Sequence, residues 1–202
     1  MHDETIVSVS ETCVVLFDVF SLTLAKCHFA KARIGDAAPD FELRLKAELA
    51  PRLAGRRELA LAHTHTREQL DLVYAVHERY VPESLGLLNR FLRDHYTGEV
   101  GTIDPQLFDL LHRVRQVLGS TAAFQVISGY RAPATNLRLR LTRGGGVASK
   151  SLHTEGRAID VRLPGVALAD LRDAALSLRA GGVGYYARED FVHLDTGRVR
   201  HW

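Results

Sequence analysis

Two histidines and one aspartate near the C-terminal end of the chain have the clearest chemical potential. His153 and Asp160 lie in one short segment, and His193 follows in a second. Two imidazoles and one carboxylate match a catalytic zinc site, in which three protein ligands leave the fourth position open. A structural zinc site more often has four ligands that include cysteines, and no cysteine lies near these residues. The residue types therefore predict a hydrolytic metal site.

Two short predicted strands and a loop would position these ligands. Side chains alternate between the two faces of a strand, so Asp160 would point away from the core in a strand over 157–163. The same alternation places His193 on one face of a strand over 190–195. His153 would complete the site from the loop before the first strand, where Gly156 permits a tight turn. Taken singly, each histidine could be an ordinary surface or core residue and the aspartate a turn former; the combination favours a metal.

The motif Ser-x-His-x-x-Gly-x-Ala-x-Asp at 151–160, followed by His-x-Asp at 193–195, resembles the LAS group of zinc metallopeptidases. This group contains D-Ala-D-Ala carboxypeptidases, VanX-type dipeptidases and murein endopeptidases, and it shares its fold with the Hedgehog signalling domain. Within the group the chain is most similar to the YcbK (MepK) type of murein endopeptidase. The resemblance covers roughly residues 57–202, and its further motifs are Ile127-Ser128-Gly129-Tyr130-Arg131, Gly181-Gly182-Val183-Gly184-Tyr185-Tyr186 and His201-Trp202.

The resemblance implies a role for each matching residue. His153, Asp160 and His193 would bind one Zn²⁺ per chain. Arg131 would face the substrate and stabilise the oxyanion of the transition state. A guanidinium suits that task because it stays protonated and its planar fork matches an oxygen acceptor. Without the resemblance, Arg131 could equally be a surface residue after a strand. Ser151 would contact the substrate beside the metal.

The general base is the least certain of the implied roles. In much of the family an acidic residue stands three positions before the last histidine, and Asp190 occupies that position here. Glu189 is the alternative, but it would point the opposite way if the strand has already begun. Asp195 is expected to accept a hydrogen bond from a ligating imidazole and so orient it.

The implied function is hydrolysis of the stem peptides or peptide cross-links of peptidoglycan, with a zinc-activated water as nucleophile. That substrate implies a location in the periplasm or cell envelope. Two alternatives stay open: a D-Ala-D-Ala carboxypeptidase or dipeptidase, and a catalytically silent zinc-containing module that binds peptidoglycan. An endopeptidase needs a groove open at both ends, whereas a dipeptidase needs a short, closed cleft. A binding module would not need both a base and an oxyanion-stabilising group at the metal.

The composition agrees with a single globular domain, because 202 residues of which 46% are hydrophobic can bury a sizeable core. The formal net charge of +2 does not indicate a nucleic-acid-binding protein, which would need a stripe of basic residues for the phosphate backbone. No segment has the roughly 20 apolar residues of a membrane span. The pattern does not indicate an oligomeric state.

Residues 1–55 match no motif and are interpreted as an N-terminal extension to a metallopeptidase domain over 56–202. The apolar stretch 13–20 is short and follows an acidic start, so it lacks the basic region of a secretory signal. Ala30-Lys31-Ala32 nevertheless resembles a cleavage site. A degenerate export segment and a wrongly assigned extension both remain open. Cys13 and Cys27 fall in this extension and do not decide the redox compartment.

The predicted fold is an α+β domain of the Hedgehog or DD-peptidase type, with a small antiparallel sheet, helices packed on one face and the zinc site on the other. Strands over 124–128, 157–163, 182–186 and 190–195 would form its centre, and strands over 58–63 and 70–75 a hairpin. His63 and His65 share a face of that hairpin and are expected at its solvated end, since no third metal ligand lies nearby in the sequence. The periodicity predicts helices over 85–95, 105–118, 132–141 and 168–178, and Gly144-Gly145-Gly146 a loop beside the site.

Overall fold

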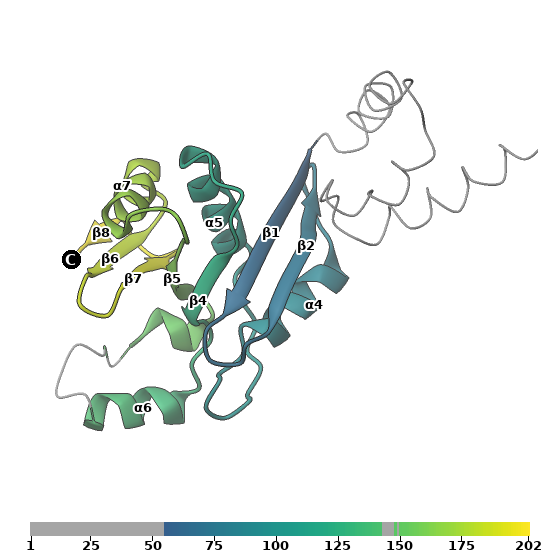
Figure 1. Cartoon of the computed structure of the whole chain (residues 1–202). Helices are drawn as coiled ribbons and strands as arrows, with labels where there is room; N and C mark the ends of the chain where they lie inside the picture. Colours follow the sequence, from purple (N-terminus) through teal and green to yellow (C-terminus); the bar gives the residue numbers. More distant parts are fainter. Residues whose placement is uncertain (1–54, 143–147, 149) are drawn as a thin grey trace, which may run out of the picture. The chain divides into compact units, whose positions relative to one another are not determined.

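A mixed β-sheet runs through the part of the chain that the computed structural model describes, residues 55–142, 148 and 150–202. Eight strands are hydrogen-bonded there in the order β3-β2-β1-β4-β5-β7-β6-β8 (Figure 1). Their bounds are β1 Arg56–His63, β2 Gln69–Val76, β3 Arg79–Tyr80, β4 Phe124–Ser128, β5 Ala158–Arg162, β6 Gly182–Tyr186, β7 Phe191–Asp195 and β8 Arg200–His201. The expected extension, both cysteines and the triple-glycine loop lie outside the described residues.

The α+β class is confirmed, but the small antiparallel sheet is a wrong prediction. Strands β4, β5, β7 and β6 are neighbours, as expected for the centre. However, β1 pairs with β4 in parallel, Leu61 opposite Phe124, and β6 pairs with β8 in parallel. A parallel pair needs a long crossover connection. The segment between β1 and β4, which carries two helices and the β2–β3 hairpin, provides one. Local sequence patterns do not reveal that the chain comes back to pair β4 with β1.

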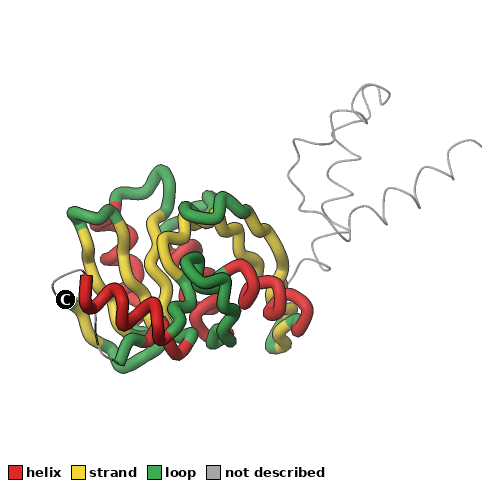
Figure 2. The backbone as a smooth tube through the Cα atoms, turned by 90° about the horizontal axis from the view of Figure 1, so that it is seen from below, coloured by secondary structure: helices red, strands yellow, loops and turns green. Residues whose placement is uncertain are grey.

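Four helices accompany the sheet in the described residues: α4 Pro82–Phe91, α5 Pro105–Val117, α6 Pro133–Thr142 and α7 Leu168–Leu178. The predicted start of α5 is confirmed, because the Asp104 carboxylate accepts a hydrogen bond from Gln106 N at 3.0 Å and Pro105 follows it. Helix α5 contacts β1 and α7, and α7 contacts β6 and β7. Figure 2 shows the strands side by side with the helices lying along them.

Alternation along β5 and β7 separates the core from the site. Ile159 and Val161 of β5 are fully buried and belong to the hydrophobic core, as do Val192 and Leu194 of β7. The residues between them therefore project to the opposite face of the sheet. Asp160 and His193 are those residues, so the same alternation that forms the core also presents two metal ligands.

The β1–β2 hairpin ends in a histidine cluster, and the expected solvated end is wrong for His63. Its side chain is only 2% exposed and packs against the rings of Phe91 and His95, at 5.9 and 5.6 Å between centroids. His65 is exposed and stacks on His95 at 4.2 Å. The segment after α4 folds back over the hairpin end, and that long-range contact has no counterpart in the local pattern.

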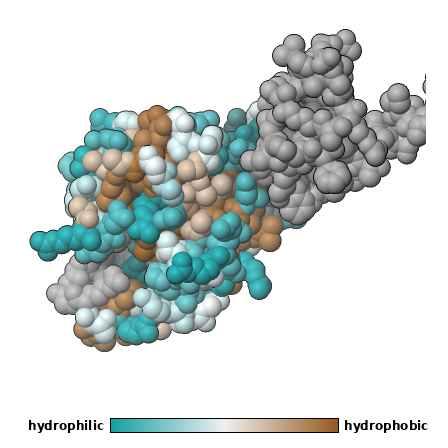
Figure 3. Space-filling model, viewed as in Figure 1, coloured by the Kyte–Doolittle hydropathy of each residue, from teal (hydrophilic) through white to brown (hydrophobic). Residues whose placement is uncertain are grey.

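The surface has no broad apolar area on the face seen in Figure 3, where hydrophobic residues form several separate areas among hydrophilic ones. Among the described residues, none of the helices has the length and apolar character that crossing a membrane requires.

Candidate metal centre

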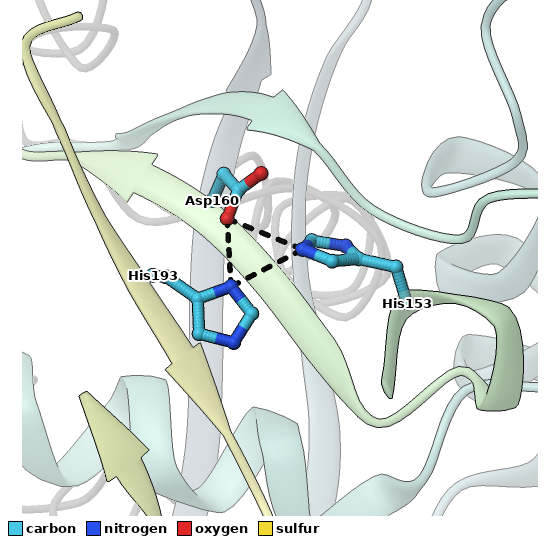
Figure 4. A group of neighbouring side chains, drawn as sticks. All are labelled: His153, Asp160 and His193. Atoms are coloured by element: carbon cyan, nitrogen blue, oxygen red, sulfur yellow. Dashed lines mark hydrogen bonds and ion pairs between the residues drawn. The ribbon is translucent and has the colours of Figure 1, made fainter. Parts of the chain in front are cut away.

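Three different elements bring the three predicted ligands together (Figure 4). Asp160 of β5 lies directly opposite His193 of β7 in the antiparallel ladder. His153 comes from a short 3₁₀-helix, η2 Leu152–Glu155, which ends at Gly156. Gly156 has a φ of 67°, and a Cβ atom there would lie 1.9 Å from the carbonyl oxygen of Thr102. A glycine is therefore required where the chain turns from the first ligand into the second ligand's strand.

The donor atoms of the three residues converge on one point. Asp160 Oδ1 lies 2.9 Å from His193 Nδ1 and 3.2 Å from His153 Nε2, and the two ring nitrogens are 3.2 Å apart. All three side chains are buried. In the part of the chain that the structure describes, this is the one group of three His, Cys, Asp or Glu ligand atoms close enough to share an ion.

The outer nitrogen of each imidazole has a hydrogen-bond acceptor, and this tests whether the residues fit a metal. His153 Nδ1 donates to the carbonyl oxygen of Gly129 at 2.8 Å, and His193 Nε2 donates to Asp195 Oδ2 at 3.1 Å. In the neutral form of each ring, the unprotonated lone pair is therefore on His153 Nε2 or His193 Nδ1, the two atoms that face Asp160. Fixing the tautomer in this way is characteristic of metal-ligating histidines. The donor set of two nitrogens and one carboxylate oxygen fits Zn²⁺.

The carboxylate of Asp195 is itself held in place on all sides. Its side chain is fully buried and accepts hydrogen bonds from Arg200, Gly182 N and Gly197 N as well as from His193. Burial alone would raise the pKa of Asp195, but these donors hold it well below its usual value. An ionised carboxylate behind His193 is the arrangement that the orienting role of Asp195 requires.

The electrostatics of the ligands also favour a cation. Burial would raise the pKa of Asp160, yet the neighbouring His153 and His193 hold it well below its usual value, so the carboxylate is ionised. Burial lowers the pKa of His153 and so favours its neutral ring. Burial opposes protonation of His193 too, but the hydrogen bonds to Asp160 and Asp195 outweigh it and raise that pKa. A proton on His193 would compete with a metal ion for the same position.

Arg131 lies beside the ligands. Its backbone N–H donates to the carbonyl oxygen of His153 at 3.1 Å, which ties the two segments together. The guanidinium Nη2 is 3.6 Å from Asp160 Oδ2 and 3.4 Å from Ser128 Oγ, and the side chain is 13% exposed. The cation is therefore close enough to act on a group bound at the metal.

A cavity of about 330 Å³ opens over this centre. Arg131, the three ligands and Ser151 line it. Several further lining residues had no role assigned from the sequence: Lys150, Tyr186, Phe191, Arg200 and Trp202. The terminal His-Trp motif was the available signal for Trp202, whose ring lies 5.3 Å from that of His193 and whose Nε1 donates to the Tyr186 hydroxyl at 2.8 Å.

Asp190 is not brought to the ligands. It lies in the β6–β7 turn with a φ of 55°, its side chain is 62% exposed, and Oδ2 accepts a hydrogen bond from Arg162 Nη1 at 2.7 Å. It does not line the cavity over the metal ligands. Glu189 lines a neighbouring cavity together with Arg131 and Asp160. The carboxylate of Asp190 would have to leave Arg162 to reach the site.

A sheet that presents two histidines and an aspartate to one point, with a cation and an open cavity beside them, defines a metal-dependent hydrolase. The chain belongs to the peptidoglycan L,D-endopeptidase MepK family, whose model matches residues 52–202. It is thus a member of a metallopeptidase family, as the motifs predicted.

Three curated relatives illustrate the similarity. The peptidoglycan L,D-endopeptidases MepK of Escherichia coli K12 and of Shigella flexneri are each 49% identical over 146 residues, covering 72% of this chain and 80% of the relative. The Haemophilus influenzae protein named "Probable peptidoglycan L,D-endopeptidase MepK" is 40% identical over 148 residues, covering 72% and 78%. No solved structure matches the chain significantly.

Proposed function

We propose that this chain is a zinc-dependent endopeptidase that hydrolyses L,D peptide bonds in the cross-links of peptidoglycan. The observation that carries the proposal is the convergence of His153 Nε2, His193 Nδ1 and Asp160 Oδ1 in a family of peptidoglycan endopeptidases. The L,D bond is the one named for the relatives at 40–49% identity.

The residues of the chain would divide the work as follows. His153, Asp160 and His193 would hold the Zn²⁺, which when bound supplies an activated water and polarises the scissile carbonyl. Asp195 keeps the ring of His193 in the orientation and tautomer that ligation needs. Arg131 would stabilise the negative charge that develops on the carbonyl oxygen. Ser151, which lines the cavity, would contact the substrate backbone.

We retain Asp190 as the proposed general base, because it stands three positions before His193, where much of the family has an acidic residue. To act as the base, its carboxylate would have to leave Arg162. Glu189 remains the alternative, since it lines the cavity next to the ligands. The amide variants Asp190→Asn and Glu189→Gln separate the two, because the variant of the true base should lose turnover by about 100-fold or more.

Three wider proposals accompany this function. Residues 56–202 would form the catalytic domain and 1–55 a separate extension. The fold would be of the Hedgehog or DD-peptidase type, with helices covering the face of the sheet opposite the metal, which agrees with the burial of Ile159 and Val161 on the face away from Asp160. Helix α6 departs from this arrangement, because its Leu139 lines the cavity over the ligands. The protein would act in the periplasm or cell envelope, where its substrate is found.

The decisive experiment is digestion of purified cross-linked and uncross-linked muropeptides by the zinc-loaded protein, with products identified by mass spectrometry. Cleavage of cross-linked dimers to monomers at an L,D bond is expected. The double variant His153→Ala with Asp160→Ala is the matched control and should release nothing. Release of a terminal D-alanine alone would make the protein a carboxypeptidase, and binding without cleavage would make it a silent module.

A further inference from the structure

A second cavity, of about 250 Å³, adjoins the one over the metal ligands. The two share four lining residues, Arg131, Leu139, Asp160 and Phe191. Asp160 is a metal ligand and Arg131 the cation beside it, so the junction of the two cavities coincides with the reactive centre. All three ligands line the first cavity and Asp160 also lines the second, so space for a bound peptide continues from the metal site into the second cavity.

Stacked rings form one wall of this second cavity. The ring of His95 lies 4.2 Å from that of His65, with only 6° between the planes, and 4.2 Å from that of Tyr96. Burial, with a further effect from His65, lowers the pKa of His95 to about 4, so the ring is neutral at physiological pH. His95 Nε2 is buried and has no hydrogen-bond partner among the described residues. Such an atom is rare in a native structure unless a ligand or water completes it.

Buried hydrogen bonds hold this wall in place relative to Arg131. The Asp94 carboxylate is 1% exposed and accepts from Tyr96 N and from Ala132 N, each at 2.8 Å. It therefore links the ring-bearing segment to the residue that follows Arg131. Because the donors around Asp94 already satisfy its charge, Glu189 is the exposed carboxylate among the residues that line this cavity.

The first cavity has the opposite charge character. Arg200 lines it, but its guanidinium is paired with the buried Asp195 at 2.7 Å. Lys150 is exposed and lines this cavity but not the second, so its ammonium group adds a positive charge on that side. A substrate that spans both cavities would thus meet Lys150 in one and Glu189 in the other, and would pass Arg131 and Asp160, which line both.

We propose that the two cavities are the two arms of a single substrate cleft. The Lys150 arm binds a part of the substrate that carries a free carboxylate, and the His95–Glu189 arm binds a part that carries a free amino group. The inference rests on the proposed function and deepens it, because it assigns a charged group to the substrate in each arm of the cleft. A cleft that continues from the metal site into a second arm suits an endopeptidase rather than an enzyme that trims chain ends.

The test uses one cross-linked muropeptide in three forms: untreated, with its amino groups acetylated, and with its carboxylates amidated. The zinc-loaded parent, Glu189→Gln, Lys150→Gln and the control Glu78→Gln are assayed for KM and kcat on each form. Glu78 is exposed in the turn between β2 and β3 and lines neither cavity. An exposed ion pair accounts for a change of about two- to five-fold.

Glu189→Gln should raise KM about two- to five-fold for the untreated and amidated forms and leave KM for the acetylated form unchanged. Lys150→Gln should raise KM for the untreated and acetylated forms and leave the amidated form unchanged, and its kcat should stay within about two-fold of the parent value. Equal effects on all three forms, or the reverse pairing, would overturn the proposal. So would a kcat about 100-fold lower in Glu189→Gln on every form, because that is the scale of a lost general base.

The same forms also separate this inference from the proposed function. If the parent cleaves none of them, the proposed function fails. In that case, calorimetric titration of the three forms of the muropeptide into the same four proteins measures Kd in place of KM. The expected pattern of changes in Kd is the same as for KM. A silent binding module with this cleft would still show the charge-specific pattern, whereas a protein without it would bind all three forms alike in every variant.

Discussion

His193 Nε2 and Asp195 Oδ2 are 3.1 Å apart, and this hydrogen bond determines which nitrogen of His193 faces Asp160. Both residues lie in β7 and point to the same face, so the strand that supplies the ligand also supplies the group that orients it. The ordinary alternative for such a pair is a buried ion pair that only stabilises the fold. His153 Nδ1 likewise donates to Gly129 O, so each ring has one nitrogen bonded to an acceptor and the other facing Asp160. This shared arrangement favours a role in metal binding.

Replacing Asp195 by asparagine should weaken zinc binding while the fold is kept. The amide is nearly isosteric but carries no charge to support the imidazole, and losing such a partner typically costs about 10- to 100-fold in metal affinity. Competition with a chromophoric chelator measures this. Asp173→Asn on the exposed face of α7 is the control. If a folded Asp195→Asn protein binds zinc with unchanged affinity, Asp195 has only a structural role.

Arg131→Lys should lower kcat by about 100- to 1,000-fold, because lysine offers a point charge without the planar fork. The change in KM should be smaller, since the interaction is made mainly in the transition state. Zinc content should equal that of the parent, and Arg172→Lys should have no effect. If KM rises and kcat is unchanged, Arg131 acts in substrate binding and not in catalysis.

Asp190→Asn should lower turnover by about 100-fold or more, with zinc content unchanged, if Asp190 is the general base. The pairing with Arg162 adds a second test. Arg162→Met removes that partner and should leave kcat near the parent value or above it, because it frees the carboxylate. If Asp190→Asn is fully active, Asp190 serves only as a surface partner of Arg162.

A fragment comprising residues 55–202 should fold and bind one zinc ion, because the three ligands and the hydrophobic core all lie within it. Elemental analysis after dialysis gives the stoichiometry. His153→Ala with Asp160→Ala should abolish binding. A zinc-free parent fragment, or full binding by the double variant, would refute the ligand assignment.

Stability should depend on the histidine cluster below neutral pH. Burial, followed by repulsion from His95 and His65, lowers the pKa of His63 from 6.5 to about 4. The unfolded chain therefore binds more protons in this window, so the stabilisation is complete above pH 6.5 and is lost as the pH falls towards 4. In urea unfolding of the zinc-free protein, His63→Leu should lose less stability over this window than the parent, by on the order of 1–3 kcal/mol. His201→Gln should behave like the parent.

Local patterns were sufficient for most of the elements and for the group of candidate ligands. The alternation in β5 and β7, the proline-led helices α5 and α6 and the cap at Asp104 depend on residues close in sequence, so they can be predicted from the chain alone. The bounds predicted for α4, 85–95, are wrong, because this helix begins at Pro82 and ends at Phe91. The same holds for the choice of His153, Asp160 and His193, because their types and the glycine between the first two define a zinc-binding motif.

Tertiary structure alone decided how distant segments meet. The parallel pairing of β1 with β4, the burial of His63 beneath His95 and the bond between Asp190 and Arg162 each join segments whose separation no periodicity encodes. The second cavity arises in the same way, from His65, His95, Arg131 and Glu189 on four separate segments. Residue types determine which chemistry is available to this chain. The pairing of distant segments and the packing of side chains determine which groups face one another, and both are global properties of the fold.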